Sequence, residues 1–374
     1  MDFSVSSGNL LKALQRASGA VGFNSKLLPI IDNFLLEVLG DKLIVSATNM
    51  DLSIVTETEL ISADENLTIV VPSTILLESL KSMPDHPIQF NVNLDDYIIK
   101  ITSEYGKYNL NGFAADDFPE LQDLPESAGF DFPCNLFEKG FGQTAVAALN
   151  DEMKKGMQGV SFKLEDGKVI FAATDGHRLI KNLFYADVGD QEDSVILPRK
   201  GLLSALKPLL VDGEDMNIRL SKERIFFNTK KGLLICRLAE GNFPNYEAVI
   251  PQNNPNKLYL DRLDFINTLK RVSLYSNQST YQVFMDLGPQ SLTISAVDID
   301  FNRSGNEQFP CTYEGENMEI GFNGRLLTEM LSVLDTEQIR FEILDKVRAT
   351  LIFPEEQEEG QEITLLIMPV SHRP

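Results

Sequence analysis

The residues best suited to catalytic chemistry lie in one short segment. Asp175, His177 and Arg178 combine a carboxylate, an imidazole and a guanidinium, which could serve a hydrolase or a metal site. A catalytic zinc normally takes three protein ligands, and the other histidines, His86 and His372, stand in unrelated contexts. The chain has no HExxH, paired-cysteine or GxSxG motif. We therefore expect a structural role or a binding contact here and no enzyme; loss of a measured hydrolysis in a His177→Ala protein would restore the catalytic alternative.

Length and composition limit the other classes. The 374 residues are 43% hydrophobic and 24% charged, enough for two or three globular domains. No leader and no apolar run of the roughly 20 residues that a bilayer requires is present, which predicts a cytoplasmic protein without a membrane partner. Cys134, Cys236 and Cys311 are scattered and are expected to be reduced core residues. Without a GxxxxGK[ST] or GxGxxG motif, neither a nucleotide cofactor nor a metal is expected.

One sequence pattern occurs three times. The copies are DKLIVSATNMDLSI at 41–54, GKVIFAATDGHRLI at 167–180 and QSLTISAVDIDFN at 290–302. Ala47, Ala173 and Ala296 occupy equivalent places, about 125 residues apart, which is the length of a domain and not of a solenoid repeat. The expected boundaries lie near 125 and 252, where PESAG and PQNNPN supply chain breakers. The predicted domains are therefore 1–124, 125–251 and 252–374.

Leucine spacing and turn signals predict the elements of each domain. Helices are expected over 8–20, 72–82, 135–150, 198–210, 260–277 and 323–334, two in each domain. Short β runs include Tyr97–Ile101, Arg224–Asn228 and Leu233–Arg237. The acidic segment Glu355–Gln361 is expected to be a solvated loop between two strands. Strands gathered around two helices indicate an α+β fold with antiparallel sheets.

The distribution of charge suggests a partner. The net charge is −22, yet the six predicted helices hold eleven Lys and Arg residues against five Asp and Glu. Helices turned toward a common axis would give a cationic cavity that holds double-stranded DNA by its phosphates without reading bases. The candidate DNA-facing residues are Lys12, Arg16, Lys26, Lys81, Arg199, Lys200, Lys207 and Lys270. The alternatives are ordinary solvated helix faces, or a protein scaffold that never touches DNA.

Four motifs resemble the bacterial DNA sliding clamps, the β subunits of DNA polymerase III. They are ATDGHRL at 173–179, LPRKG at 197–201, EGNFPNY at 240–246 and the terminal IMP at 367–369, and the similarity runs from end to end. The resemblance implies a head-to-tail homodimer, a closed six-domain ring with helices lining the hole and antiparallel sheets outside. Such rings slide on duplex DNA as non-catalytic processivity factors. The implied partners are the replicative polymerase catalytic subunit, an ATP-driven clamp loader and other clamp-binding replication and repair proteins.

The resemblance also implies two sites. The positions that match the family's client-peptide pocket are Lys154, Met157, Thr174, Gly176, His177, Arg178, Leu179, Pro244, Val249, Met368, Pro369 and Val370. Tyr108, Leu110, Leu274 and Tyr275 match the dimer interface; the alternative for these four is ordinary intradomain core. The chain departs from the family pattern at Ala248, where many relatives carry Arg, and in the longer tail with Ser371, His372 and Arg373.

Overall fold

The computed structural model describes residues 1–22, 25, 28–151, 154–186, 188 and 192–370. Lys26 and the tail residues 371–373 therefore lie outside the described residues. The chain forms two compact units, one of Met1–Glu138 with Lys200–Leu238 and one of Lys139–Arg199 with Ala239–Pro374. Among the residues that the structure describes, no helix has the length and apolar content needed to cross a membrane.

One order of elements occurs three times: a strand, a helix, a run of strands, a second helix and three further strands. The first copy has β1 (Asp2–Ser6), α1 (Ser7–Ala17), β2 (Asn33–Leu39), β3 (Lys42–Thr48), β4 (Leu52–Glu59), β5 (Ser62–Ala63), β6 (Leu67–Pro72), α2 (Ser73–Lys81), β7 (Pro87–Val92), β8 (Ile98–Thr102) and β9 (Lys107–Asn111). The second has β10 (Phe130–Pro133), α3 (Cys134–Ala145), β11 (Gly159–Glu165), β12 (Lys168–Thr174), β13 (Arg178–Tyr185), β14 (Asp193–Pro198), α4 (Leu202–Leu206), β15 (Asp215–Leu220), β16 (Arg224–Thr229) and β17 (Gly232–Arg237). The third has β18 (Asn256–Asp261), α5 (Arg262–Ser273), β19 (Gln282–Leu287), β20 (Ser291–Asp298), β21 (Arg303–Pro310), β22 (Thr312–Glu314), β23 (Met318–Asn323), α6 (Gly324–Leu331), β24 (Gln338–Ile343), β25 (Thr350–Pro354) and β26 (Gln361–Ile367).

The sheets are antiparallel, and two of the four join strands of different copies. The first unit has sheets of order β5-β1-β7-β8-β9 and β10-β15-β16-β17-β4-β3-β2-β6; the second has β14-β11-β12-β13-β26-β25-β24-β18-β22 and β21-β20-β19-β23. Leu234 of β17 lies opposite Ile54 of β4, and Arg178 of β13 lies opposite Ile367 of β26. The middle copy thus pairs with the first copy through one half and with the third through the other. This explains why the two compact units divide the middle copy, while the boundaries near 125 and 252 stay a prediction.

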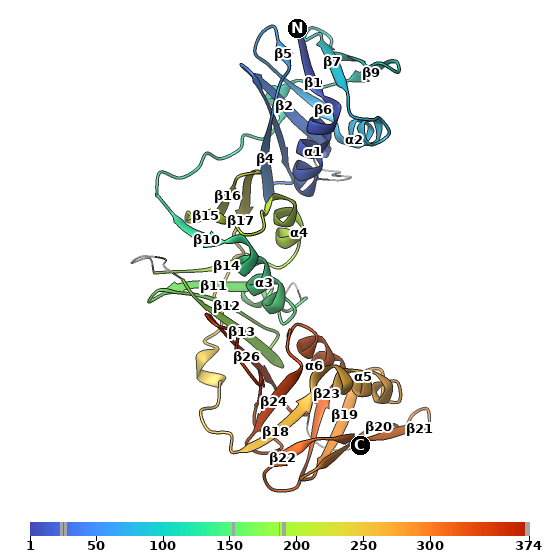
Figure 1. Cartoon of the computed structure of the whole chain (residues 1–374), viewed down its shortest axis with the longest axis vertical. Coiled ribbons are helices and arrows are strands. Elements are labelled where there is room, and N and C mark those ends of the chain that lie inside the picture. Colours follow the sequence, from blue (N-terminus) through green and yellow to red (C-terminus); the bar gives the residue numbers. More distant parts are fainter. Residues whose placement is uncertain (23–24, 26–27, 152–153, 187, 189–191, 371–374) are drawn as a thin grey trace. The chain divides into compact units, whose positions relative to one another are not determined.

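All six predicted helices are present, and their sequences explain where they begin. The Ser6 side chain accepts a hydrogen bond from the backbone N of Asn9 and caps α1, which buries Leu10, Leu14 and Ala17. Asn323 caps α6 in the same way, accepting from two backbone amides of the first turn. Helices α1 and α2 pack side by side in the first unit, and α5 and α6 do so in the second (Figure 1).

The helix predicted over 198–210 is much shorter than expected. Pro198 still belongs to β14, and Gly201 has φ of +82°, a backbone conformation that stops a helix from forming before Leu202. After Leu206 the chain continues as a 3₁₀ turn that contains Pro208, a residue without a backbone donor. Arg199 and Lys200 therefore lie in the turn before α4, and the expectation that they occupy a helix was wrong.

Two smaller predictions are confirmed, and one needs a correction. The strand predictions correspond to β8, β16 and β17, and residues 355–360 form an exposed loop between β25 and β26. Cys134 and Cys236 are buried free thiols, whereas Cys311 is only half-buried. Burial raises the pKa of Cys236 and that of Cys311, so both thiols resist ionisation.

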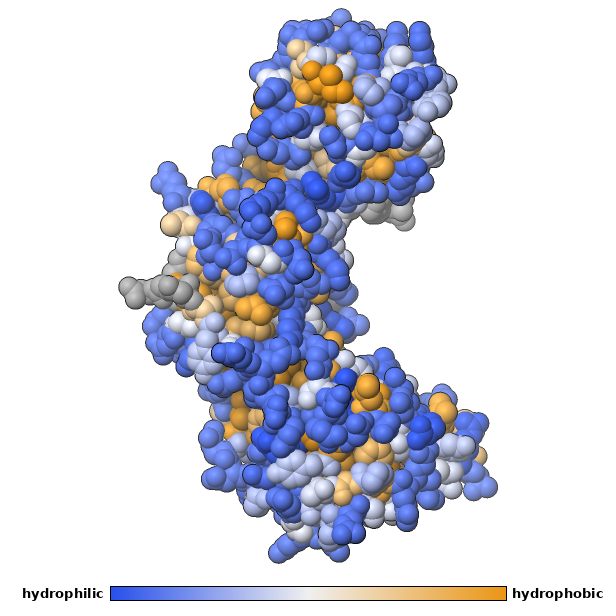
Figure 2. All heavy atoms as spheres, viewed as in Figure 1, coloured by the Kyte–Doolittle hydropathy of each residue, from blue (hydrophilic) through white to orange (hydrophobic). Residues whose placement is uncertain are grey.

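The faces visible in Figure 2 are mostly hydrophilic, with apolar residues in separate groups.

Candidate functional site

The turn between β12 and β13 holds the residues that first suggested chemistry. The hydroxyl of Thr174 donates to the carbonyl of Arg178 at 2.7 Å. One oxygen of Asp175 accepts from the backbone N of His177 at 2.9 Å and of Arg178 at 3.0 Å. Gly176 has φ of +89°, which a side chain would strain. The carboxylate of Asp175 is thus engaged in shaping the turn, and no group of three metal-ligating side chains occurs within the described residues.

Arg178 is nearly buried and is held by two carboxylates. Its side chain is only 7% exposed. The Nε donates to Asp175 Oδ2 at 3.0 Å, and Nη1 donates to Glu329 Oε2 at 2.8 Å. Burial would raise the pKa of the Glu329 carboxyl, but the hydrogen bonds and charges of Arg178 and Arg325 outweigh it and lower that pKa overall. The arginine therefore has its charge balanced where it enters the wall of a cavity.

That cavity has a volume of about 200 Å³ and a predominantly apolar lining. We call this cavity the apolar pocket. It is lined by Met157, Thr174, Gly176, His177, Arg178, Leu179, Pro244, Asn245, Tyr246, Val249, Leu366 and Met368. The backbone N of Met368 donates to the carbonyl of His177 at 2.8 Å, which ties the segment just after β26 to the β12–β13 turn. Beneath it, Leu179, Tyr246 and Leu366 belong to a buried cluster with Ala172 and Leu351.

The structure brings together most of the positions predicted for the pocket. Lys154 is exposed and lies outside the lining, as does Pro369. Val370 donates from its backbone N to the carbonyl of Gly321 at 2.8 Å and is likewise not part of the lining. Asn245, Tyr246 and Leu366 line the pocket but were not predicted. Leu366 could have been found from strand alternation, because it lies two residues before Met368.

The buried phenol of Tyr246 fixes the loop that follows β17. Its ring packs edge-on against Phe243, with the ring centroids 5.8 Å apart, and Lys181 lies over its face at 5.9 Å. Burial raises the pKa of Tyr246, and the neighbouring Glu247 raises it further. Val249 projects from the next turn and is 59% exposed. One wall of the pocket is therefore anchored by an aromatic pair, and its rim remains open to solvent.

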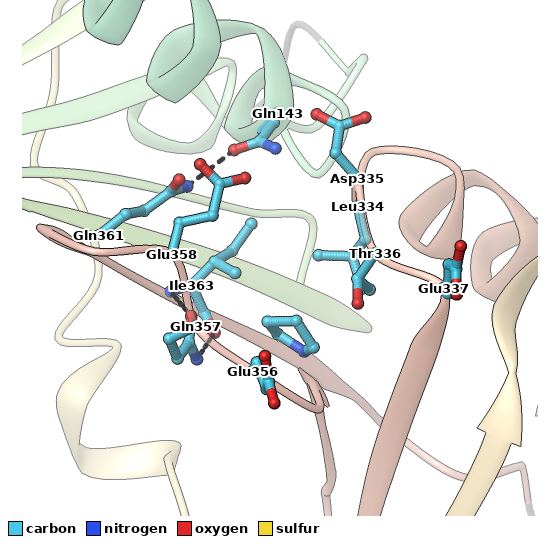
Figure 3. Close-up of a pocket in the computed structure, with 11 residues that line it drawn as sticks. Gln143, Leu334, Asp335, Thr336, Glu337, Glu356, Gln357, Glu358, Gln361 and Ile363 are labelled. Carbon is cyan, nitrogen blue, oxygen red and sulfur yellow. Dashed lines mark hydrogen bonds between the residues drawn. The ribbon is translucent and has the colours of Figure 1, made fainter.

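A second cavity in the same unit is larger and polar. It has a volume of about 420 Å³, and its lining includes Asp335, Glu337, Glu356 and Glu358 (Figure 3). At its base, the amide of Gln361 donates to Gln143 Oε1 at 3.1 Å, and Gln143 itself donates to the carbonyl of Val333 at 2.9 Å. We call it the acidic cavity. Carboxylates and engaged amides offer little surface to an apolar peptide, despite the larger volume.

The predicted DNA-facing cations differ in how they are paired. Lys81 pairs with Glu78 at 2.9 Å and Lys207 pairs with Glu138 at 2.8 Å; this contact raises the pKa of Lys207. Arg199 is half-buried and donates to the carbonyl of Ala148 at 3.3 Å. The remaining described candidates are Lys12, Arg16, Lys200 and Lys270, none of which forms an ion pair within the described residues; Arg16 is half-buried and the three lysines are exposed.

The predicted interface residues lie on the surface. Leu274 is 75% exposed, Tyr275 45% and Tyr108 37%, while Leu110 is half-buried. The alternative that all four are intradomain core is therefore wrong. Tyr108 and Leu110 belong to β9, the last strand of its sheet, and Tyr275 contacts Gly305 in β21, the edge strand of another. Exposed edges of this kind can pair with another chain.

Comparison with known proteins gives a match along the chain. Models described as the N-terminal, central and C-terminal domains of the DNA polymerase III beta subunit match residues 1–122, 131–245 and 247–371. The beta sliding clamp of Haemophilus influenzae is 27% identical over 371 residues, covering 99% of this chain and 100% of its own. A crystal structure of the DNA polymerase III subunit beta from Pseudomonas aeruginosa superposes with a TM-score of 0.93 at 28% identity, over 99% of this chain and 100% of that one. A second structure of the Pseudomonas aeruginosa clamp, bound to griselimycin, has a TM-score of 0.92 at 27% identity and covers 100% of both chains.

Proposed function

The chain belongs to the family of DNA polymerase III β subunits, and on this premise we propose that it is a sliding clamp. Two copies form a ring around duplex DNA, and a loader opens and closes this ring. In the cytoplasm the ring tethers the replicative polymerase and other clients. It is a non-catalytic subunit. The observation that carries this proposal is the end-to-end match of three family domains to one chain with a threefold repeated order of elements.

The apolar pocket is the proposed client site. Supporting this assignment, aliphatic side chains and two methionines, Met157 and Met368, line it, and such surfaces adapt to several partner peptides. A related clamp is known bound to griselimycin. We expect griselimycin to bind this pocket and to compete with client peptides there.

The proposed ring seam joins β9 of one copy to β21 of another. Both are edge strands, and exposed apolar side chains lie beside them: Tyr108 on β9, and Leu274 and Tyr275 at the end of α5. Ile299 and Phe301 are 64% and 66% exposed in the turn between β20 and β21, and Asp300 of this turn accepts a hydrogen bond from Asn277, just after α5, at 3.0 Å. Strand pairing flanked by apolar contacts would close a head-to-tail dimer.

A substitution at the seam tests the dimer. Changing Leu274 to Asp places a charge in the proposed contact, and we expect sedimentation to show a monomer with an unchanged circular dichroism spectrum. The matched control is Leu263→Asp, which changes a 56% exposed leucine at the other end of α5 and should leave the dimer intact. A Leu274→Asp protein that stays dimeric would remove the seam assignment.

Encirclement is tested by the shape of the DNA. The protein is loaded by a clamp loader onto nicked circular DNA in moderate salt, and half of the sample is linearised. Retention on circles with loss through free ends supports a topological ring. Equal retention on both forms would mean ordinary phosphate binding. No retention on either, with a competent loader, would favour the protein scaffold.

A further inference from the structure

Glu329 lies outside the apolar pocket and yet is bound to its wall. Its two carboxylate oxygens accept from different arginines: Oε2 from Arg178 Nη1 at 2.8 Å, and Oε1 from Arg325 Nε at 3.1 Å. Arg325 and Glu329 are one helical turn apart on α6, and Arg178 comes from β13, 151 residues away in sequence from Glu329. No residue of α6 lines the pocket. A single carboxylate thus connects this helix to the pocket wall.

The guanidinium of Arg178 depends on this carboxylate. Asp175 engages Nε, but Asp175 also caps the β12–β13 turn through its other oxygen. Without Glu329, Nη1 of a nearly buried arginine would lose its charged acceptor, and the side chain would gain by turning toward water. Because Arg178 lines the pocket, such a rotation would change the wall that a ligand meets.

We infer that Glu329 is a positioning residue for the apolar pocket: it holds the Arg178 guanidinium in the wall and makes ligand affinity depend on a helix that contributes no lining residue. This inference rests on the proposed function of the pocket. It also places Arg325, on the exposed face of α6, in the same ion network as the pocket.

Griselimycin is the probe for the test. Calorimetric titration of the full-length protein should show about tenfold weaker binding to Glu329→Gln than to wild type, because the neutral amide of Gln offers one acceptor oxygen to two arginines and no charge to Arg178. The matched control is Glu337→Gln, which removes the same charge from an exposed position shortly after α6 and should bind within twofold of wild type. Thermal unfolding of each variant checks that the fold is kept. Should Glu329→Gln fail to fold, Glu329→Asp replaces it: one methylene shorter, it cannot reach both arginines, and we expect at least threefold weaker binding.

A spectroscopic signature separates positioning from general destabilisation. In protein labelled with ¹⁵N-arginine, the Nη signals of Arg178, identified by their absence in Arg178→Lys, should show slow rotation in wild type and in Glu337→Gln. They should show fast rotation in Glu329→Gln. Wild-type affinity and slow rotation retained in Glu329→Gln, or wild-type affinity in Glu329→Asp if that variant has to be used, would overturn the inference alone. No binding of griselimycin to the wild type would overturn the pocket assignment and the inference with it.

Discussion

The apolar pocket and the cations proposed to face DNA differ in construction. The pocket is concave, gathers residues from four chain segments and rests on a buried cluster. The cations are scattered over several elements, and three of them, Lys12, Lys200 and Lys270, are exposed without an ion pair within the described residues. A concave apolar site suits one ligand geometry, whereas scattered charges suit a uniform polyanion that can move past them. The proposed functions need these two different properties: specific binding of clients at one site, and weak, non-specific binding of DNA that permits sliding.

The acidic cavity sharpens this comparison. It is about twice as large as the apolar pocket, yet carboxylates and engaged amides form much of its lining. Size alone therefore is no basis for choosing the proposed client site. The composition of the lining decides, because removing apolar surface from water supplies most of the affinity for a peptide.

The largest expected effect comes from a charge in the apolar pocket. Val249 lines it and is 59% exposed, so Val249→Asp leaves the core untouched while placing a carboxylate where an apolar ligand must bind. We expect griselimycin affinity to fall by about thirtyfold or more in calorimetry, with the salt dependence of binding to a short duplex unchanged. Ala248→Asp is the control, since Ala248 is exposed in the same 3₁₀ turn but does not line the pocket. Equal losses in both variants would mean that charge alone matters, and the contrast between the two surfaces would fail.

A smaller effect is expected for the unpaired cations. Replacing Lys12, Lys200 and Lys270 together by Ala should reduce the slope of log affinity for a short duplex against log salt by about 3, since each phosphate contact releases a counterion. Fluorescence anisotropy between 25 and roughly 200 mM salt measures the slope. The control removes three exposed lysines outside the helices, Lys100, Lys222 and Lys346, with the same change in net charge. Matching slopes for the two triple variants would show that Lys12, Lys200 and Lys270 have no special role in DNA binding.

The repeated elements could be predicted from the sequence because their signals are local. Ala47 and Ala173 lie seven residues before their partners across the hairpin, Ile54 and Ile180, so similar sequences fold into similar hairpins. The first residue of a helix was predicted wrongly where one residue overrides the leucine pattern, as Gly201 does before α4. Most of the pocket followed from motifs, since contiguous segments supply its lining.

Contacts between distant segments could not be predicted in this way. The pairing of β17 with β4 joins the first two copies, and neither strand carries a signal for the other. Glu329 is separated from Arg178 by 151 residues, and a glutamate in a helix pattern is usually predicted to be a solvated surface residue. The same holds for the ion pairs of the cations, because a lysine in a helix pattern gives no indication of which carboxylate it meets in space.

The smallest expected effect concerns a paired cation. Lys139 of α3, a cation of the six predicted helices that is not among the DNA-facing candidates, is half-buried, and its Nζ lies 2.5 Å from Glu358 Oε2 in the acidic loop between β25 and β26. Exposed ion pairs contribute little to stability, so Glu358→Gln should leave the fold unchanged and free one cation. We expect about twofold tighter duplex binding by anisotropy, with a slightly steeper salt slope. Glu359→Gln, the control, changes the neighbouring glutamate of the same loop and alters net charge equally. Glu359 has no ion-pair partner among the residues that the structure describes. An increase in duplex affinity confined to Glu358→Gln would show that pairing with Glu358 limits the positive charge available to DNA. An equal increase in both variants would assign the effect to the overall negative charge, and paired and unpaired cations would then not differ in DNA binding.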